Sequence, residues 1–431
     1  MELLANDFTT VFKSPNPENT YLGTPSICVM KNGRYVVSHD LFTKDEKKNS
    51  DFFSINEDII PHPVSGKFNI GQIFVSDDKG ETWRKVATRN FYHARIFESG
   101  NELYLLGHCG DIIIYRSLDG GESWDEGHYL TENESWHGSA GKTWIENGYI
   151  NLVIEPRIFK EGEIKDGWDV FSLAPVLLRA RIGDDLTKKE NWVFSDKVRF
   201  RDVVKEDEID LHGIPFFPTT LHKNEYPEGT TTNNMSGWLE ANVLRIKDEK
   251  HYWYDPNGKT FHILMRAHTS WTGYGALMKA VIEEKDGKET IKIVPEVNPS
   301  GKKVVYLPLP GGQMRFHITW DEETQLFWLL STQATDSMTR KELLPPDRFN
   351  LPYDERRRMQ LSFSKNLVDW CFAGMVAIGD TEKESRHYAS MEIDGDDIVL
   401  VSRSGSPAAY SAHNVDLITF HRIKDFRSLV Y

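Results

Sequence analysis

Ionisable side chains recur at the beginnings and ends of the apolar segments of this 431-residue chain. Those at segment beginnings are Tyr21, His93, His137, Glu240 with Asn242, Arg315 with His317, and Arg386, His387 and Tyr388. Those at segment ends are His39 with Asp40, His108, Glu155 with Arg157, Arg266 with His268, Gln333, and Arg403. Guanidinium groups pair bidentately with carboxylates, and buried carboxyl, imidazole and phenol groups can be tuned for proton transfer. The set suits acid–base chemistry on an anionic substrate.

Two other interpretations of these residues stay open. A strand end can be polar simply because it leaves the core, and a ring of charged residues can be a structural ion-pair network that stiffens a channel. A functional site is favoured because the pattern recurs in every pair of segments.

A repeating framework must hold these segments, because two turn motifs have the same form. Ser76 to Trp83 and Ser117 to Trp124 both read S-x-D-x-G-x-[ST]-W, the pattern of an Asp box. In such a turn the Asp and Ser side chains bond nearby backbone N–H groups, and the Gly takes a positive φ. We expect the Trp to pack between repeats. Ser364 to Trp370 and Asp185 to Trp192 are interpreted as degenerate copies.

Tight turns between apolar strands give the number of repeats. They fall at Asn32-Gly33, Ser99-Gly100, Asn147-Gly148, Asn257-Gly258, Glu322-Glu323 and Asp394-Gly395. A turn of this kind between two apolar runs predicts a hairpin. A third strand follows each turn, which makes six units, and repeats of this length are typical of propellers.

The sequence therefore predicts an all-β fold, a six-bladed β-propeller with four-stranded antiparallel blades, as one domain over residues 1–431. The sixth blade is expected to be completed by the N-terminal residues, which removes exposed sheet edges. Residues 195–236 fit no blade and are interpreted as a long insertion, the alternative being a seventh, degenerate blade. In each blade the start of the first strand and the end of the second lie on one rim, so the ionisable residues converge there.

Composition excludes several partners. The formal net charge of -14 argues against nucleic acid and anionic membranes. No run of roughly 18 apolar residues exists, so no membrane span is expected. The start, Met1 to Asp7, lacks the features of a secretory signal, so the chain is expected either to be cytoplasmic or to begin after a removed signal.

No cofactor is expected, because Gly138 to Lys142 lacks the full phosphate-loop spacing and no dinucleotide-binding glycine motif occurs. No metal site is predicted either, since His108, Cys109 and Asp111 on one strand end are an insufficient ligand set alone. The three cysteines, Cys28, Cys109 and Cys371, lie too far apart to indicate a disulfide framework.

The Asp boxes, six units and rim residues together resemble the sialidase superfamily, over most of the chain. The resemblance implies a six-bladed fold and hydrolysis of a terminal acidic sugar from a glycan. Trp238 to Asn242 is similar to the strand that carries the family's Glu, which implies that Glu240 polarises a Tyr nucleophile. His387 to Gly395 is similar to the nucleophile strand, which makes Tyr388 the nucleophile, and Asp40 resembles the general acid.

The same resemblance implies that Arg266 and Arg315 belong to a carboxylate-binding set, and Arg386 is expected to hold the anionic group with them. Where sialidases carry an Arg-Ile-Pro signature, this chain has Leu22 to Ser26, so the first Arg of that set is absent at Gly23. Arg157, Arg386 or the histidines could compensate, or the substrate could be a different sugar. The remaining rim residues, Glu155, His39, His108, His268, His317 and Gln333, are expected to contact the substrate.

Two alternative functions stay open. A polysaccharide lyase or rhamnose-releasing enzyme acting next to a uronic acid would use Arg to neutralise the carboxylate and His or Tyr to move a proton. His93, His137 and Arg157 would then be central. A non-catalytic carbohydrate-binding propeller is the third possibility, because a fold alone does not establish activity.

Overall fold

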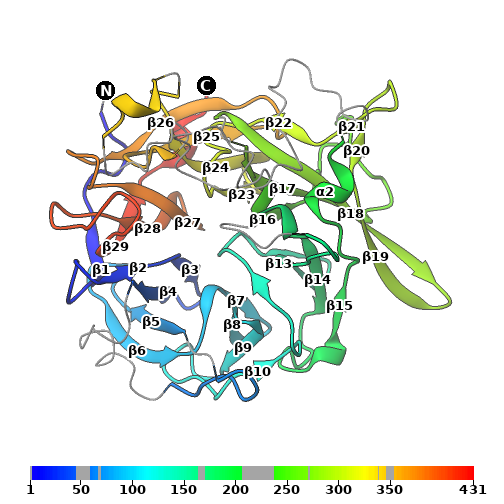
Figure 1. The fold of residues 1–431 in the computed structure, drawn as a ribbon, viewed down its shortest axis with the longest axis horizontal. Coiled ribbons are helices and arrows are strands. Elements are labelled where there is room, and N and C mark those ends of the chain that lie inside the picture. The colour runs from blue at the N-terminus through cyan, green and yellow to red at the C-terminus, as the bar shows by residue number, and fades with distance from the viewer. Residues whose placement is uncertain are drawn as a thin grey trace.

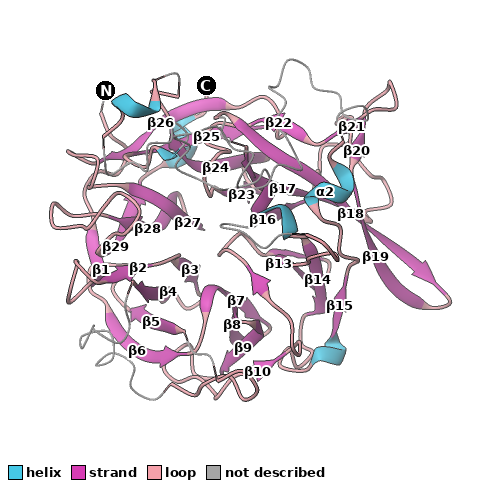
Figure 2. Ribbon diagram, in the orientation of Figure 1, coloured by secondary structure: helices cyan, strands magenta, loops and turns pink. Residues whose placement is uncertain are grey.

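The computed structural model describes residues 2–44, 59–66, 69–163, 170–205, 237–269, 272–337, 339–345 and 354–431. Six antiparallel sheets are arranged around a central axis, as Figure 1 shows. Strands make up nearly all of the regular structure, and the few helical segments are short (Figure 2). The chain is a six-bladed β-propeller, which confirms the predicted fold class.

Each blade runs outwards from the axis along the chain. The first blade consists of β2 (Thr20–Leu22), β3 (Ser26–Val29), β4 (Tyr35–Thr43), β5 (Ile70–Ser76) and β6 (Arg84–Arg89). The second consists of β7 (Tyr92–Ser99), β8 (Glu102–Cys109), β9 (Asp111–Ser117) and β10 (His128–Tyr129). The third consists of β11 (Trp136–His137), β12 (Trp144–Glu146), β13 (Tyr149–Pro156), β14 (Val176–Arg181) and β15 (Trp192–Phe194).

The other three blades follow the same plan. The fourth consists of β16 (Gly237–Leu244), β17 (Thr260–His268), β18 (Tyr274–Lys285), β19 (Lys288–Val294) and β22 (Tyr306–Pro308). The fifth consists of β23 (His317–Asp321), β24 (Leu326–Gln333), β25 (Arg358–Ser364) and β26 (Cys371–Ile378). The sixth consists of β27 (Arg386–Asp394), β28 (Asp397–Ser404), β29 (Leu417–Ile423) and β1 (Thr9–Lys13).

The two ends of the chain close the ring. β1 pairs antiparallel with β29, with Thr9 opposite Phe420 and Lys13 opposite Leu417. This strand from the N-terminus completes the sixth blade, as predicted, and it covers a strand edge that would otherwise be free to pair.

One predicted hairpin is wrong. Tight turns do join the first two strands of the second and sixth blades, where Ser99 faces Glu102 and Asp394 faces Asp397. In the fourth blade, however, β16 ends at Leu244 and β17 begins at Thr260, so Asn257-Gly258 lies in a long loop. Its turn is local, because the Asp255 carboxylate accepts bonds from the loop's own backbone N–H groups.

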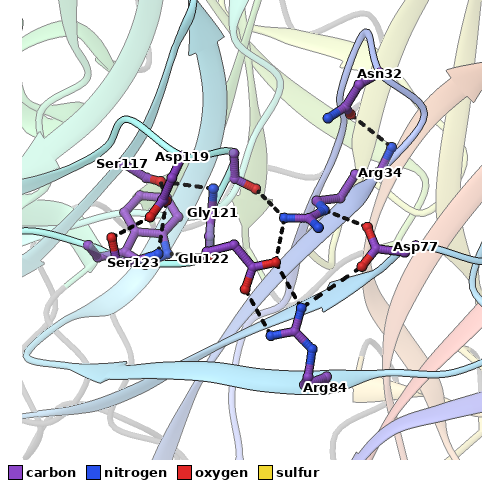
Figure 3. A network of polar contacts seen from close by, with 11 residues as sticks. Asn32, Arg34, Asp77, Arg84, Ser117, Asp119, Gly121, Glu122 and Ser123 are labelled. Carbon is purple, nitrogen blue, oxygen red and sulfur yellow. Dashed lines mark hydrogen bonds and ion pairs between the residues drawn. The ribbon is translucent and has the colours of Figure 1, made fainter.

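The two Asp-box motifs fold into the same hydrogen-bonded turn. In the first, the N–H of Gly80 donates to Ser76 Oγ at 2.8 Å and that of Thr82 to Asp78 at 2.9 Å. Figure 3 shows the second, in which Gly121 and Ser123 donate to the Ser and Asp side chains at the same distances. The repetition shows that the sequence pattern specifies this turn locally.

The tryptophan of each motif packs onto the preceding blade. The Trp83 ring lies 5.4 Å from that of Phe420 in the sixth blade. Trp124 is 5% exposed and belongs to a cluster with Val36 and Val75 of the first blade. The core is accordingly a series of apolar layers between neighbouring blades.

The predicted insertion is only partly described. Within residues 195–205 the chain forms one short helix, α2 (Phe200–Val203), whose Phe200 packs edge-on against Trp238 at 5.2 Å. Residues 206–236 lie outside the described part of the chain. Among the described helices, none is long and apolar enough to cross a membrane.

Candidate active site

Three residues of the first strands share an uncommon backbone geometry. His93, Glu240 and Tyr388 have φ values of 51°, 61° and 51°. Each lies where the pairing of the first strand with the second shifts register, in β7, β16 and β27. A left-handed conformation at a non-glycine residue costs about 1–3 kcal/mol, and bulges re-aim side chains. The same bulge therefore positions three of the predicted catalytic residues, in alternate blades.

Buried carboxyl groups hold two of these bulges from the neighbouring blade. Asp40 in β4 accepts a hydrogen bond from the backbone N–H of His93. Glu155 in β13 accepts one from Ala241 N at 2.9 Å and another from the N–H of Glu240. Burial raises the pKa of both carboxyl groups to about 7.

Arg315 holds the third bulge through its carbonyl groups. Its Nη1 donates to the backbone oxygens of Tyr388 and Ala389, the latter at 3.1 Å, and its Nη2 donates to Ala140 O at 2.6 Å. Arg315 was expected to bind substrate. The structure instead places it beneath Tyr388, with its terminal nitrogens bonded to backbone.

The carboxyl group of Asp40 also accounts for the departure at Gly23. A Cβ atom on Gly23 would lie 2.0 Å from Asp40 Oδ2. The same carboxyl accepts a hydrogen bond from Thr24 N at 2.9 Å. Because Asp40 fills this space, a side chain at residue 23 fits only if that carboxyl moves away.

The phenol of Tyr388 is buried among charged side chains. Its oxygen lies 2.7 Å from Arg266 Nη1, and the same nitrogen lies 3.4 Å from Glu240 Oε2. Arg266 is held in turn by a 2.8 Å bond from its Nε to Gln313 O. Burial raises the pKa of Tyr388, and the nearby guanidinium charges oppose that rise.

Two further arginines lie against the Tyr388 ring. The guanidinium carbons of Arg356 and Arg403 are 5.5 Å and 5.4 Å from its centroid. Arg356 is oriented by Asp354 at 2.5 Å and contacts His387 at 3.0 Å. Burial, with the Arg356 charge, lowers the pKa of Arg403 to about 10. Tyr388, Glu240, Arg266, Arg356 and Arg403 form what we call the Tyr388 cluster.

Sequence reasoning missed Arg356. The run Arg356-Arg357-Arg358 was an available signal, because three consecutive arginines are unusual just before a strand, here β25. Arg403 was recognised as a strand end but was given no substrate role.

Three histidines lie together beside the Tyr388 cluster. His93 Nδ1 is 3.2 Å from His108 Nε2, and the ring centroids of His93 and His137 are 5.0 Å apart. Burial lowers the pKa of all three, to about 3 for His137, and the charge of Arg157 lowers them further. These imidazoles are therefore neutral at pH 7. With Glu155 and Arg157 they form the histidine cluster.

His137 and Glu155 lie within hydrogen-bonding distance and link the two clusters. His137 Nδ1 lies 3.2 Å from Glu155 Oε2. Burial lowers the pKa of the imidazole to about 3 and raises that of the carboxyl to about 7, so at pH 7 the imidazole is neutral and the carboxyl is protonated part of the time. Glu240 and Arg266 also act on the pKa of His137, which shows that the clusters are neighbours.

Several predicted site residues lie elsewhere. His39 is fully buried, with its ring stacked between Phe12 and Phe74 at 5.1 and 5.5 Å. Arg386 donates to three backbone oxygens, those of Glu384, Ser385 and Gly405, at 2.9–3.0 Å. Neither side chain joins the clusters.

The remaining predicted substrate residues are His268, Gln333 and His317. His268 is the last residue of β17. Burial and, to a smaller extent, the nearby charge of Arg266 lower the pKa of its imidazole to about 3. Gln333 ends β24 and is half-buried. His317 lines a separate pocket farther along the axis.

Within the described residues, no group of three or more His, Cys, Asp or Glu side chains could hold a metal ion. Asp111 instead organises a loop, because its carboxyl accepts bonds from Thr131 Oγ1 and from the N–H groups of Asn133 and Glu134. It also lies 3.1 Å from His62 Nε2.

No protein-family model and no curated protein sequence matches this chain. Solved structures are similar to it. A protein of unknown function from Dyadobacter fermentans is 12% identical over 97% of this chain and 98% of that one, with a TM-score of 0.52. The NanB sialidase from Streptococcus pneumoniae is 10% identical over 97% of this chain and 71% of that one, with a TM-score of 0.51. An α-L-arabinanase from Penicillium chrysogenum is 12% identical over 99% of both chains, with a TM-score of 0.47. At these identities the similarity to the two structures with TM-scores above 0.5 establishes the fold alone.

Proposed function

We propose that this chain is a glycoside hydrolase that releases a terminal acidic sugar, with Tyr388 as its nucleophile. The observation that carries the proposal is the contact of the Tyr388 phenol with Arg266 at 2.7 Å, beside Glu240. A tyrosine nucleophile is a known variant among glycosidases. The shared fold with a sialidase is compatible with this assignment.

In the proposed first step, the phenolic oxygen of Tyr388 bonds to the anomeric carbon while the bond to the leaving-group oxygen breaks. Glu240 accepts the phenolic proton, which is needed because burial raises the pKa of Tyr388. Arg266 stabilises the negative charge that develops on the phenolic oxygen. Water then attacks the anomeric carbon and releases the sugar, which restores the phenol.

We assign the leaving-group proton to the pair of Glu155 and His137. Glu155 and Asp40 both have a pKa raised to about 7, so both hold a proton part of the time at neutral pH. Both carboxyl groups accept bonds from backbone N–H groups, but Glu155 also lies 3.2 Å from an imidazole that can relay its proton. This assignment differs from the resemblance, which implies Asp40.

The acidic character of the substrate follows from the arginines around Tyr388. Arg266, Arg356 and Arg403 gather three positive charges on one tyrosine, on a chain whose formal net charge is -14. Glu240 within this cluster and Asp354, which pairs with Arg356 at 2.5 Å, compensate part of this charge. A carboxylate on the sugar would pair with these guanidinium groups in the geometry they favour.

One observation favours a second candidate, elimination next to a uronic acid. His93, His108 and His137 are kept neutral beside Arg157, and a neutral imidazole can accept the proton α to a carboxylate. In that reaction Arg157 would neutralise the carboxylate while the C–O bond to the leaving group breaks. The product would be unsaturated and would contain no added water.

The test is a screen of sialosides and of uronate-containing oligosaccharides, with product masses measured. Hydrolysis adds one water per bond cleaved, and elimination adds none. Tyr388→Phe and Glu240→Gln should abolish hydrolysis, while the control Tyr115→Phe, which changes a buried tyrosine of β9, should not. Hydrolysis at the wild-type rate by both site variants would refute the proposed mechanism.

A further inference from the structure

Arg403 is held at the junction of the sixth and first blades, which are neighbours in the ring (Figure 1). It lies near the end of β28 and is 4% exposed. Its guanidinium carbon is 5.4 Å from the ring centroid of Tyr388 in the sixth blade and 5.2 Å from that of Phe42 in the first. The guanidinium group therefore lies against two aromatic rings from different blades, each within the range of a cation–π contact.

A tight turn in the segment that follows β28 fixes the outer end of this side chain. Arg403 Nη2 donates to His413 O at 2.5 Å. The turn is closed by Ser411, because its Oγ accepts hydrogen bonds from the N–H groups of His413 and Asn414 at 3.3 and 2.9 Å. Ser411 N also donates to Asn414 O at 3.3 Å. Residues 411–414 thus form a compact turn that presents one carbonyl oxygen to the guanidinium group.

The end of β4 supplies the other half of the support. Asp40 and Phe42 are two residues apart on this strand, so their side chains lie on the same face. Burial raises the pKa of Asp40 and the charge of Arg403 opposes that rise, which places the two groups near each other. Phe42 is half-buried, and its ring lies 6.0 Å from that of His413. The strand end and the turn therefore converge on Arg403.

One terminal nitrogen of Arg403 remains for a ligand. Its Nη2 is engaged by the turn and its Nε is fully buried, whereas Nη1 bonds to none of the residues that the structure describes and is not fully buried. Arg356 differs, since its two terminal nitrogens bond to Asp354 and His387. Arg403 is therefore the better placed of these two arginines to donate a hydrogen bond to a substrate carboxylate.

This support lies beside Gly23, where the resemblance to sialidases implies an arginine. Leu22 N donates to Val415 O at 3.1 Å, so the segment after the turn runs alongside Gly23. The carboxyl of Asp40 fills the space next to Gly23, and the same carboxyl attracts Arg403. An arginine from the sixth blade is thus directed towards the place where the first blade has none.

We propose that Phe42 and the turn of residues 411–414 position Arg403 to bind the substrate carboxylate, in place of an arginine at Gly23. This role rests on the proposed function, because it concerns the acidic group of the same substrate. Phe42 is a positioning residue, since it acts through Arg403. An aromatic face stacks on a planar guanidinium group and limits its orientations, which an aliphatic side chain does not do. Preference for acidic over neutral sugars then depends on Phe42 as well as on the arginine.

Ligand binding tests this role without requiring catalysis. The probes are sialic acid, glucuronic acid and galacturonic acid, each compared with its methyl ester by titration calorimetry. The wild type should bind at least one acid more tightly than its ester, because only the acid carries the charge that Arg403 recognises. Phe42→Leu should weaken binding of that acid by about threefold to thirtyfold, the range of a cation–π contact, and leave binding of the ester unchanged. Phe42→Tyr keeps the ring and should retain the wild-type preference.

Phe12→Leu is the matched control. Phe12 is also half-buried, but it packs against His39 and Phe74, so its loss should leave the preference for the acid unchanged. If Phe42→Leu does not fold, Ser411→Ala, which removes the acceptor that closes the turn, should weaken binding of the acid and not of the ester.

Three results would overturn the proposal: equal binding of acid and ester by the wild type, no binding of any of the three acids, or the same loss in Phe42→Leu and Phe12→Leu. Product masses separate this test from that of the proposed function. Acid-selective binding that depends on Phe42, without any hydrolysis, would refute the hydrolase alone. Hydrolysis of an acidic glycoside with the same KM in the wild type and in Phe42→Leu would refute the positioning role alone.

Discussion

At the residue scale, the surroundings of Tyr388 shift the pKa of its phenol in opposite directions. Burial raises its pKa and the charge of Glu240 does the same, whereas Arg266, Arg356 and Arg403 stabilise the phenolate. A nucleophile in this setting stays protonated until a base removes its proton, and the arginines then stabilise the charge that forms. The same arginines are the proposed partners of the substrate carboxylate, so binding and activation use one set of side chains.

Arg403→Gln should weaken binding of acidic substrates. Loss of one charged hydrogen-bonding partner should raise KM by about tenfold to a hundredfold, with a smaller change in kcat, as steady-state kinetics would show. Arg386→Gln is the matched control, because its guanidinium bonds to backbone oxygens away from the cluster. Equal effects of both variants on KM would contradict the assignment of Arg403.

Glu155→Gln should change the pH dependence of stability in a defined direction. Burial raises the pKa of Glu155 from 4.5 to about 7, so the folded state retains a proton that the unfolded chain has released between these values. This group therefore makes the wild type less stable as pH rises through that window, by up to about 3 kcal/mol. Gln cannot ionise, so denaturant unfolding at pH 4.5 and pH 8 should show the wild type losing stability relative to the variant. Parallel pH profiles for the two proteins would be inconsistent with a raised pKa.

At the scale of elements, the bulges decide which side chains reach the site. The first strands of three blades carry the same kind of bulge. A different side chain bonds to the backbone of each bulge: Asp40, Glu155 or Arg315. Glu155 and Arg315 were predicted to bind the substrate, and Asp40 was predicted to be the general acid. The hydrogen bonds show that they position the backbone of the predicted catalytic residues, and Glu155 also lies beside an imidazole suited to proton transfer.

Gly23→Ala tests the support of the first bulge. The new Cβ would lie 2.0 Å from Asp40 Oδ2, so the carboxyl must move away from the N–H of His93. We expect a loss of about 1–3 kcal/mol in the free energy of unfolding. The control is Gly138→Ala, whose Cβ would meet Ile154 at 3.3 Å and need only a small adjustment. Equal losses in the two variants would argue against a specific role for the Asp40 carboxyl.

The Asp-box turns should matter more for stability than the ion pairs between them. Asp119→Ala removes the acceptor for Ser117 Oγ and for both the N–H and Oγ of Ser123, so we expect a loss of about 1–3 kcal/mol in denaturant unfolding. Arg34 connects the two turns through Asp77 and Glu122, as Figure 3 shows, but those carboxyl side chains are 58% and 37% exposed. Arg34→Ala should therefore cost less than about 1 kcal/mol. A larger loss in Arg34→Ala than in Asp119→Ala would reverse this ranking.

The elements were predictable where their chemistry is local. The Ser76 to Trp83 turn is specified by its own side chains, and the third strands follow from short apolar runs such as Asp111–Ser117. The loop from 245 to 259 was not predictable, because Asn257-Gly258 forms a turn there without joining paired strands directly. The bulges were not predictable either, since Leu239-Glu240-Ala241 has no residue that demands a positive φ.

At the scale of the whole molecule, closure of the ring brings distant residues together. Arg266 of the fourth blade contacts Tyr388 of the sixth, and Asp40 of the first contacts the backbone of the second. Sequence reasoning placed Tyr388, Glu240 and Arg266 on one rim by counting blades, and in the structure Arg266 contacts both Tyr388 and Glu240. It could not assign directions to Arg315 and Arg386, because a strand-end arginine can turn either to the channel or to its own backbone.

The measurement that tests the central claim most directly is the mass of the products released from acidic glycosides by the wild type and by Tyr388→Phe. We predict that the wild type forms products whose combined mass exceeds that of the substrate by one water. In the folded Tyr388→Phe variant the rate of this hydrolysis should fall by at least about a thousandfold. Products without added water, or equal hydrolysis by the two proteins, would contradict a hydrolase that uses Tyr388 as its nucleophile.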